Sequence, residues 1–490
     1  MDRATARIVD ALKNKEKITI IGDYDVDGVT STTLMKLFFE EIEYPIEWII
    51  PNRFKDGYGL SANIIPRILG TDLAITVDNG ISAVYAAQLC KDEGIDLIIT
   101  DHHLLAPEIP KAYAIIDQKQ KECKFPYSDV CGAQIAWYLI ASLKNALEIK
   151  INMISYMELV AIAIIADMMP LQHINRAMVE VGIQALNKSN RPAIKAFLEH
   201  SGKETLNAED IGFFLAPLLN SAGRMEDASF AVDFLASTNI YDARVRLERL
   251  KDFNTLRKAT EQDITEKAML QVSVDDEVIV VAGEHWHEGV VGIVAARVAR
   301  HHEKPCIVLS QSEEGILKGS GRSFGECDLF SIVDDCREHL EKFGGHSAAI
   351  GLSLQQGSLE AFKIKVGQNF ASGGYEKEVV DPEIVGELHF SDISFDLTSL
   401  VKKFEPYGQG NSKPKFISSN VEILQADTMG KEGEHLRFSF VQDGIVMQGV
   451  KFKSKEVFEA GQKVTLTYTV NENHFRGNVN LQLMVDKVTI

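Results

Sequence analysis

The segment KITIIGDYDVDG, residues 17–28, sets the fold class of the first third of the chain. Its apolar part, 17–22, is typical of a buried strand, and three aspartates follow that strand directly. A helical pattern comes next, over 31–42. A strand, a polar turn and a helix in this order form the first part of a βαβ unit, so the segment predicts an α/β domain with a parallel sheet.

Three more apolar runs, at 72–77, 95–100 and 112–116, continue this alternation, with a helical pattern at 83–91. The motif DNG follows the first of these runs, and the motif DHH follows the second. Because the carboxyl ends of parallel strands meet at one edge of a sheet, we expect both motifs to lie beside the aspartates of 23–27.

Each motif also has an ordinary interpretation by itself. The segment 23–28 suits a calcium loop or a helix cap, the pair Asp78 and Asn79 suits a turn, and adjacent histidines are common on surfaces. Their placement after successive strands favours a shared site, where crowded carboxylates repel one another unless cations are bound. Asp167 ends an apolar helical run and also needs a partner. Oxygen ligands with imidazole indicate Mn²⁺ or Mg²⁺.

At 490 residues the chain is too long for one hydrophobic core, and we expect several domains. The patterns predict a catalytic domain with a helical extension over 1–240 and a charged linker helix over 241–272. A second, smaller α/β domain is predicted over 273–375, and short alternating strands over 380–490 predict an OB-like β-barrel.

The composition, 45% hydrophobic and 25% charged, is that of an ordinary globular protein. The longest strongly apolar run, 159–166, is far shorter than the roughly 20 residues that span a bilayer, and no signal peptide is visible, so we expect a cytoplasmic protein. Six scattered cysteines without a Cys-x-x-Cys pair argue against a zinc ribbon or a disulfide framework.

The net charge of −19 by itself argues against a nucleic-acid partner, because phosphate binding usually relies on a basic field. It does not exclude one, since binding depends on a local groove. Metal-binding carboxylates would account for part of the acidity.

Four segments of the first third, GDYDVDGVTS, VDNG, DHH and ADMMPL, occur in the order and spacing of the DHH phosphoesterases. Within that superfamily the chain resembles the RecJ nucleases over nearly its whole length. The segments that carry this closer resemblance are NSAGRM at 220–225, GEHWHEGVVGIVAAR at 283–297, GSGRS at 319–323, FGGHSAAIG at 343–351 and EPYGQGN at 405–411.

The resemblance implies a 5′→3′ exonuclease that hydrolyses single-stranded DNA to mononucleotides with two Mn²⁺ or Mg²⁺ ions. It implies that Asp25 holds one ion and that Asp78 bridges both ions. It also implies that Asp23 is a metal ligand or accepts a hydrogen bond from a metal ligand. The implied ligands of the other ion are Asp27, His102 and Asp167. The residues implied at the scissile phosphate are His103 and Arg224; the alternative for Arg224 is a structural salt bridge.

The resemblance also implies a pocket for the 5′-terminal phosphate. The residues implied there are Arg53, Tyr58, Ser320, Gly321 and Arg322. Residues 320–322 suggest a Gly-rich loop whose amides, hydroxyl and guanidinium suit a phosphate. His346 either lines the same cleft or is a buried structural histidine.

Three features depart from the family pattern. The N-terminal extension is short or absent, Ile21 stands where some relatives carry a histidine, and GNS replaces GNP at 410–412.

We interpret the loop 285–287 as binding or packing rather than as a second metal site. The aromatic residues that either stack on bases or fill the barrel core are Phe438, Phe440, Phe452 and Phe475.

Two other functions remain as alternatives, a hydrolase of short oligonucleotides or cyclic dinucleotides and a non-catalytic replication scaffold. The barrel and long linker argue against the first, and the intact set of implied metal ligands argues against the second. The expected partners, by resemblance, are single-stranded DNA, a single-strand-binding protein and a RecQ-type helicase, and we expect a monomer.

Overall fold

The computed structural model describes residues 1–312, 315–373, 383–430, 433–454, 456–475 and 477–490, with 474 and 475 described by their backbone alone. The chain divides into two compact units. Residues 1–169 and 181–379 form the first unit, and residues 170–180 and 380–490 form the second.

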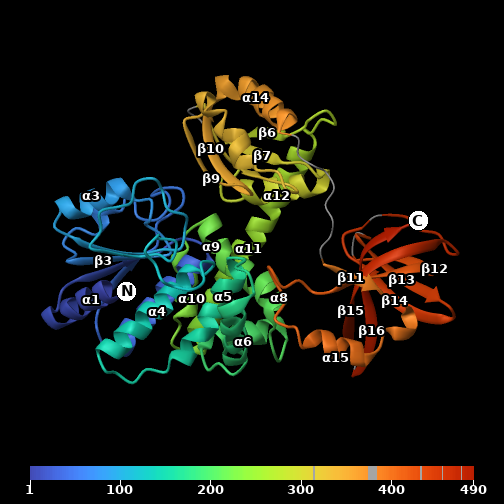
Figure 1. The fold of residues 1–490 in the computed structure, drawn as a ribbon, viewed down its shortest axis with the longest axis horizontal. Coiled ribbons are helices and arrows are strands. Elements are labelled where there is room, and N and C mark those ends of the chain that lie inside the picture. Colours follow the sequence, from blue (N-terminus) through green and yellow to red (C-terminus); the bar gives the residue numbers. More distant parts are fainter. Residues whose placement is uncertain (313–314, 374–382, 431–432, 455, 476) are drawn as a thin grey trace. The chain divides into compact units, whose positions relative to one another are not determined.

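The first sheet is parallel throughout, in the order β2-β1-β3-β4-β5 (Figure 1). Its strands are β1 (Ile18–Ile21), β2 (Glu47–Ile49), β3 (Leu73–Val77), β4 (Asp96–Thr100) and β5 (Ala114–Ile116). The predicted parallel sheet is confirmed. The sequence reading missed β2, a short edge strand whose Glu47-Trp48-Ile49 is too short to show a period.

Helices follow or precede these strands, as a βαβ arrangement requires. They are α1 (Asp2–Asn14), α2 (Val26–Glu41), α3 (Val84–Asp92), α4 (Gly132–Ala146) and α5 (Met157–Ala166). Helix α2 begins at Val26 and not near 31 as predicted, because the Asp25 side chain caps it by accepting a hydrogen bond from the Gly28 amide at 3.1 Å. This early start places Asp27 in the first turn of α2.

A helical region links this domain to the next sheet. It contains α6 (His173–Asn187), α7 (Pro192–Ser201), α8 (Ala208–Asp210), the π-helical turn η3 (Ile211–Leu215), α9 (Ala216–Met225), α10 (Ser229–Leu235) and α11 (Ile240–Met269). Helix α11 leads from this region to the second sheet, and its 30 residues match the predicted charged linker pattern (Figure 1). Among the described helices, none combines the length and apolar character that crossing a membrane requires.

The second sheet is mixed, in the order β6-β7-β8-β10-β9. Its elements are β6 (Ile279–Glu284), α12 (Val291–His302), β7 (Cys306–Gln311), β8 (Ile316–Arg322), α13 (Leu329–Asp334), β9 (Lys342–His346), β10 (Ala349–Gln355) and α14 (Leu359–Ser372). The predicted Gly-rich loop at 320–322 is wrong, since these residues end strand β8, between β7 and β10. Glycines permit the pairing: a Cβ on Gly319 would lie 2.0 Å from the Val308 carbonyl oxygen.

The second unit contains the predicted OB-like barrel. Its elements are β11 (Ile384–Glu387), α15 (Phe395–Lys402), β12 (Lys415–Met429), β13 (His435–Gln442), β14 (Ile445–Lys451), β15 (Lys463–Phe475) and β16 (Asn478–Thr489). Pairing of β12 with β15 closes the barrel. Phe438 and Phe440 are buried in its core, which excludes base stacking for both, whereas Phe452 is half exposed. The side chain of Phe475 lies outside the described residues.

Candidate active site

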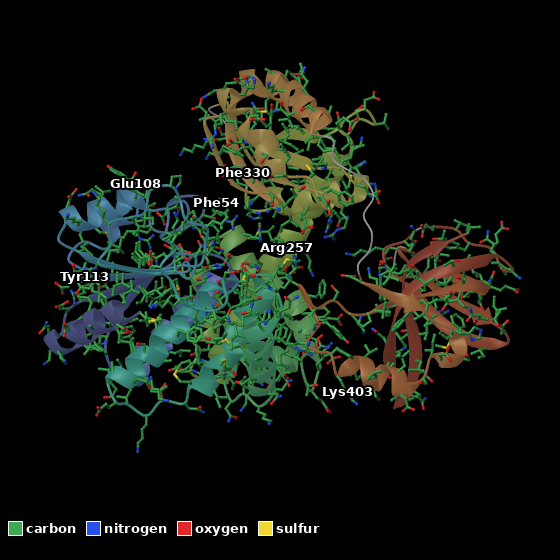
Figure 2. All side chains as sticks on the ribbon, in the orientation of Figure 1. Phe54, Glu108, Tyr113, Arg257, Phe330 and Lys403 are labelled. Carbon is green, nitrogen blue, oxygen red and sulfur yellow. The ribbon has the colours of Figure 1, made fainter. Side chains whose placement is uncertain are left out.

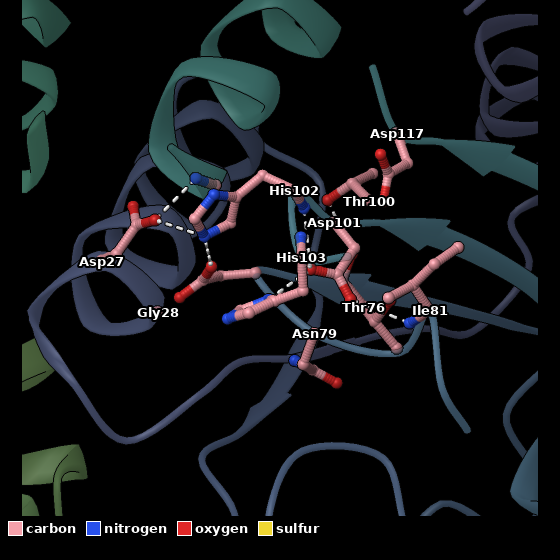
Figure 3. Close-up of polar contacts among 12 residues, drawn as sticks. Asp27, Gly28, Thr76, Asn79, Ile81, Thr100, Asp101, His102, His103 and Asp117 are labelled. Atoms are coloured by element: carbon pink, nitrogen blue, oxygen red, sulfur yellow. Dashed lines mark hydrogen bonds and ion pairs between the residues drawn. The ribbon is translucent and has the colours of Figure 1, made fainter. Parts of the chain in front are cut away.

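The three predicted motifs meet at the carboxyl edge of the first sheet, after β1, β3 and β4 (Figure 3). The Nε2 atom of His102 lies 3.1 Å from Asp78 Oδ1 and 3.6 Å from Asp27 Oδ2. It also lies 3.7 Å from Asp167 Oδ2, at the end of α5. One imidazole therefore faces carboxylates from three separate segments.

The acidic groups form sets whose ligand atoms lie within 4.8 Å of one another. One set contains Asp23, Asp25 and Asp78. A second contains Asp27, His102 and Asp167. A third contains Asp78, His102 and His103. Asp78 thus belongs to a set that contains Asp25 and to another that contains His102. All six sequence-predicted metal ligands are brought together at this edge.

Three of these carboxylate oxygens accept no hydrogen bond in the described part of the chain, although His102 Nε2 lies near two of them. Asp23 Oδ1, Asp78 Oδ1 and Asp167 Oδ2 are buried without a hydrogen bond among the described residues. Burial, then the charge of Asp27, raises the pKa of Asp167 to about 9, and burial, then Asp25, raises the pKa of Asp27 to about 6. Cations would remove both the repulsion and the unsatisfied oxygens, so the residues present fit a pair of divalent ions.

The two adjacent histidines have opposite electrostatic environments. Burial, then the charge of His103, lowers the pKa of His102 to about 3, so its ring is neutral, as a metal ligand must be. For His103 burial acts to lower the pKa, but the 2.7 Å hydrogen bond from Nδ1 to Asp101 and the charges of Asp101, Asp25 and Asp23 together outweigh burial and raise the pKa to about 9. His103 is half exposed and cationic at neutral pH.

Glycines let helix starts approach the acidic groups. The Asp27 carboxylate accepts hydrogen bonds from the amides of Gly132 and Ala133, at 2.6 and 2.8 Å, at the start of α4. A Cβ on Gly132 would lie 2.5 Å from the Asp78 Cβ. Asp78 itself has a φ of 63°, a left-handed conformation that turns the chain directly after β3. The site therefore depends on close backbone packing as well as on its carboxylates.

Three arginines gather near the acidic edge. The Arg53 guanidinium lies 4.0 Å from the centre of the Tyr24 ring, and its buried Nε has no hydrogen-bond partner among the described residues. Burial, then the charges of Arg53 and Arg322, lowers the pKa of Arg224 to about 10. Arg224 donates to the Gly289 carbonyl oxygen at 3.1 Å and has no carboxylate within ion-pair distance in the described part of the chain. The salt-bridge alternative for Arg224 is therefore wrong.

A cavity of about 810 Å³ opens beside these arginines, within the first unit. Arg53, Tyr58 and His103 line one side, and Ser320 lines the other. The Tyr58 hydroxyl lies 3.3 Å from His103 Nε2. This wall joins the proposed scissile-phosphate residue His103 to the predicted 5′-phosphate residues.

The remaining predicted pocket residues lie close by but do not line this cavity. The Arg322 guanidinium donates to the Gly321 carbonyl oxygen at 2.8 Å and packs on α12, where a Cβ on Gly292 would lie 2.9 Å from it. His346 is exposed at the end of β9, so its alternative as a buried structural histidine is wrong.

Sequence reasoning missed two kinds of residue here. Asp101 accepts hydrogen bonds from Ile81, His102 and His103, and its place as the first residue of DHH was the available signal. Lys318 and Lys342 line the cavity from β8 and β9, and no pattern in the sequence placed them there.

The loop 285–287 packs against neighbouring residues. Trp286 is buried on Gly283. The His287 ring lies 5.4 Å from that of Phe54, edge to face, and Phe54 is labelled in Figure 2. His287 Nδ1 accepts a hydrogen bond from the Gly289 amide at 3.1 Å. These contacts agree with the packing interpretation of this loop.

Comparisons with known families match most of the chain. The DHH family, N-terminal domain, matches residues 17–164, the DHHA1 domain matches 275–372, and the RecJ OB domain matches 384–487. The single-stranded-DNA-specific exonuclease RecJ of Salmonella typhimurium is 32% identical over 100% of this chain and 90% of its own length. The RecJ of Bacillus subtilis is also 32% identical over the whole chain, which spans 63% of that protein.

Solved structures give the same result for the fold. RecJ from Thermus thermophilus in complex with Mn²⁺ is 25% identical, with a TM-score of 0.87 over 99% of this chain and 71% of its own. An exonuclease RecJ bound to manganese is 27% identical, with a TM-score of 0.67 over 76% of this chain and 94% of its own.

Proposed function

The chain belongs to the RecJ family, and from that premise we propose that it is a two-metal-dependent 5′→3′ exonuclease that hydrolyses single-stranded DNA to 5′-mononucleotides in DNA repair and recombination. The observation that carries the proposal is the set of buried oxygens on Asp23, Asp78 and Asp167 that accept no hydrogen bond among the described residues, beside an arginine-bordered cavity. The buried oxygens suit cations, and the arginine-bordered cavity suits a phosphate.

Two Mn²⁺ or Mg²⁺ ions would polarise the phosphodiester and supply an activated water. In this proposal Asp23, Asp25 and Asp78 hold one ion, and Asp78 is shared with the other. The residues assigned to the second ion are Asp27, His102 and Asp167. The manganese bound in solved relatives supports the choice of metal.

His103 and Arg224 are proposed to contact the scissile phosphate. His103 carries a positive charge because Asp101 holds its proton-bearing Nδ1, and Arg224 keeps its guanidinium free of any carboxylate among the described residues. Both cations favour the negative charge that develops on phosphate oxygens during hydrolysis.

The polarity follows from the second set of cations. Arg53, Ser320 and Arg322 are proposed to bind the 5′-terminal phosphate with Tyr58 and the Gly321 backbone, and His346 lies at the exposed end of the adjacent strand β9. The Arg53 Nε, which has no hydrogen-bond partner in the described part of the chain, supports an anion at this place. A terminal phosphate bound there positions the first phosphodiester, and no other, at the metal centre.

We further propose a cytoplasmic monomer that works with a RecQ-type helicase and a single-strand-binding protein. Support for these partners comes from family membership.

The test is Mn²⁺-dependent digestion of a 5′-phosphorylated single strand that carries a 3′ label, with Asp78→Asn as the control. Asparagine preserves the size of Asp78 and tolerates its left-handed φ of 63°. The proposal expects the label on progressively shorter fragments, and none of these in the variant. Early release of the label as a mononucleotide would refute the polarity, and inactivity on any single strand would refute the exonuclease function.

A further inference from the structure

Two adjacent phenylalanines stand on the surface of the first unit. Phe213 is 75% exposed and Phe214 is 57% exposed, on the π-helical turn η3. A phenylalanine left in water forgoes the favourable free energy of burying its ring. Single π-helical turns within helices are frequent at functional sites, and exposed apolar patches mark surfaces that bind something.

The surroundings of these rings are cationic. A cavity of about 480 Å³ is lined by both phenylalanines, by the acidic Asp210 and by four cations, Lys203, Lys251, Arg257 and Lys258. The Lys203 ammonium lies 5.7 Å from the centre of the Phe214 ring. Two further acids, Glu248 and Glu261, pair with these cations, so one positive charge of the four is left over in a chain with a net charge of −19.

The ion pairs at this surface leave cations available. Lys203 pairs with the buried Asp210 and is held by it, whereas Lys251 pairs with Glu248 at the surface, where such a pair contributes little to stability. Lys258 has no ion pair in the described part of the chain. Arg257, labelled in Figure 2, is more firmly held, since it pairs with the buried Glu261 at 2.6 Å.

This surface adjoins the metal centre along two elements. Gly212 in η3 packs on Ile165, where a Cβ would lie 3.4 Å from the Ile165 Cγ2, and Ile165 is two residues before Asp167. Pro217, which lines the cavity, is in the first turn of α9, and Arg224 is in its last turn. Seven residues of helix correspond to about 10 Å. The patch therefore begins a short distance from residues proposed to hold the metal and the scissile phosphate.

We propose that this patch, formed by Phe213, Phe214, Lys203, Lys251 and Lys258, binds single-stranded nucleic acid on the 3′ side of the scissile phosphate. The inference rests on the proposed function for the direction of the strand. Aromatic rings stack on successive bases and lysines follow the phosphates, a combination that binds single strands without reading sequence. An acidic peptide would match only the positive charge of the patch. A nucleic acid strand also stacks on the two exposed rings, and it already extends from the active site.

The test compares Phe213→Ala/Phe214→Ala with the unchanged protein on two 5′-phosphorylated substrates, a 20-mer and a trinucleotide. Each lost stack weakens binding by about 1–3 kcal/mol, so we expect the KM for the 20-mer to rise about tenfold or more. The kcat, and both constants for the trinucleotide, stay within about twofold because the trinucleotide is too short to reach the patch.

Matched variants separate this effect from general damage. Tyr241 is 72% exposed on α11, so Tyr241→Ala removes an equally open ring and should leave both substrates unaffected. Lys258→Gln should raise the KM for the 20-mer and reduce its salt dependence, while Lys267→Gln, on the same helix and paired with Asp263, should not.

Binding of a labelled 20-mer in EDTA, followed by fluorescence anisotropy, decides the inference independently of catalysis. Weaker binding by the double variant than by Tyr241→Ala supports it even if the protein hydrolyses nothing, an outcome that would refute only the proposed function. Equal binding by the two variants, with unchanged melting temperatures, would overturn the inference. So would equal KM values for the 20-mer, and the patch would then belong to a protein partner.

Discussion

The two sides of the active-site cleft carry opposite charges, and neither neutralises the other. The acidic side consists of Asp23, Asp25, Asp27, Asp78 and Asp167, and the arginine side consists of Arg53, Arg224 and Arg322. Among the described residues, none of these arginines lies within ion-pair distance of any of these aspartates. Groups that existed only to stabilise the fold would pair with each other. Charges kept apart and buried instead indicate two ligands of opposite sign.

The largest effect on this opposition of charges is expected from removing the carboxylate of Asp78, which both proposed ion sites share. We expect Asp78→Asn to lower kcat about 1000-fold, because both proposed ion sites include or adjoin this residue. The metal-free variant should unfold at a temperature no lower than the unchanged protein, since one repelling buried charge is gone. Mn²⁺ should raise the melting temperature of the unchanged protein and not of the variant. A Mn²⁺-induced rise of equal size in both proteins would contradict the assignment.

The arginine side should determine the preference for a 5′-phosphate end rather than metal binding. Arg322→Met should reduce the preference for a 5′-phosphate over a 5′-hydroxyl end about 50-fold, the loss expected when charge-assisted hydrogen bonds are removed. Removing this cation also relieves its repulsion with Arg224, so the pKa of Arg224 should rise from about 10 toward its ordinary value. The ratio of kcat/KM on the two substrates measures the effect. Arg337→Met, an exposed arginine of the same domain, is the control.

How far the sequence predicted the cleft differs between its two sides. The acidic side was predictable because each motif follows a buried parallel strand, and strand ends of one parallel sheet share an edge whatever the details of packing. On the arginine side only the resemblance to the RecJ nucleases named the residues, because no local pattern shows that Ser320 reaches the cavity through antiparallel pairing of β8 with β7 and β10. A Gly-Ser-Gly segment has low strand propensity, and only tertiary contacts make it a strand.

The approach of Arg224 to Arg322 depends on long-range packing that no local pattern encodes. Arg224 reaches the Gly289 carbonyl oxygen, and Arg322 fits against Gly292 because that glycine lacks a Cβ. The assignment of individual ligands to each ion, and the domain boundaries drawn from the sequence, stay predictions.

A glycine substitution on the acidic side tests whether its geometry matters apart from its charge. In Gly132→Ala the new Cβ would fall 2.5 Å from the Asp78 Cβ, so the two segments must separate. We expect Mn²⁺ affinity to fall about 30-fold, within the range seen when the support of a metal ligand is lost. Isothermal titration calorimetry measures this directly. Gly344→Ala, where nothing lies within 4 Å of the added Cβ, should bind Mn²⁺ normally.

The smallest expected effect concerns Asp23, which follows the position where some relatives carry a histidine and this chain has Ile21. The Ile21 side chain is fully buried in the apolar core with Leu60 and Ile64 and offers no ligand. Asp23 Oδ1, by contrast, is buried and has no hydrogen-bond partner among the residues that the structure describes, and burial with the charge of Asp25 raises the pKa of Asp23. We expect Asp23→Asn to weaken one of two Mn²⁺ binding steps about tenfold and to leave the other unchanged. If neither Mn²⁺ binding step is weakened, Asp23 only supports the loop. The ion beside Asp25 would then rely on Asp25, Asp78 and water.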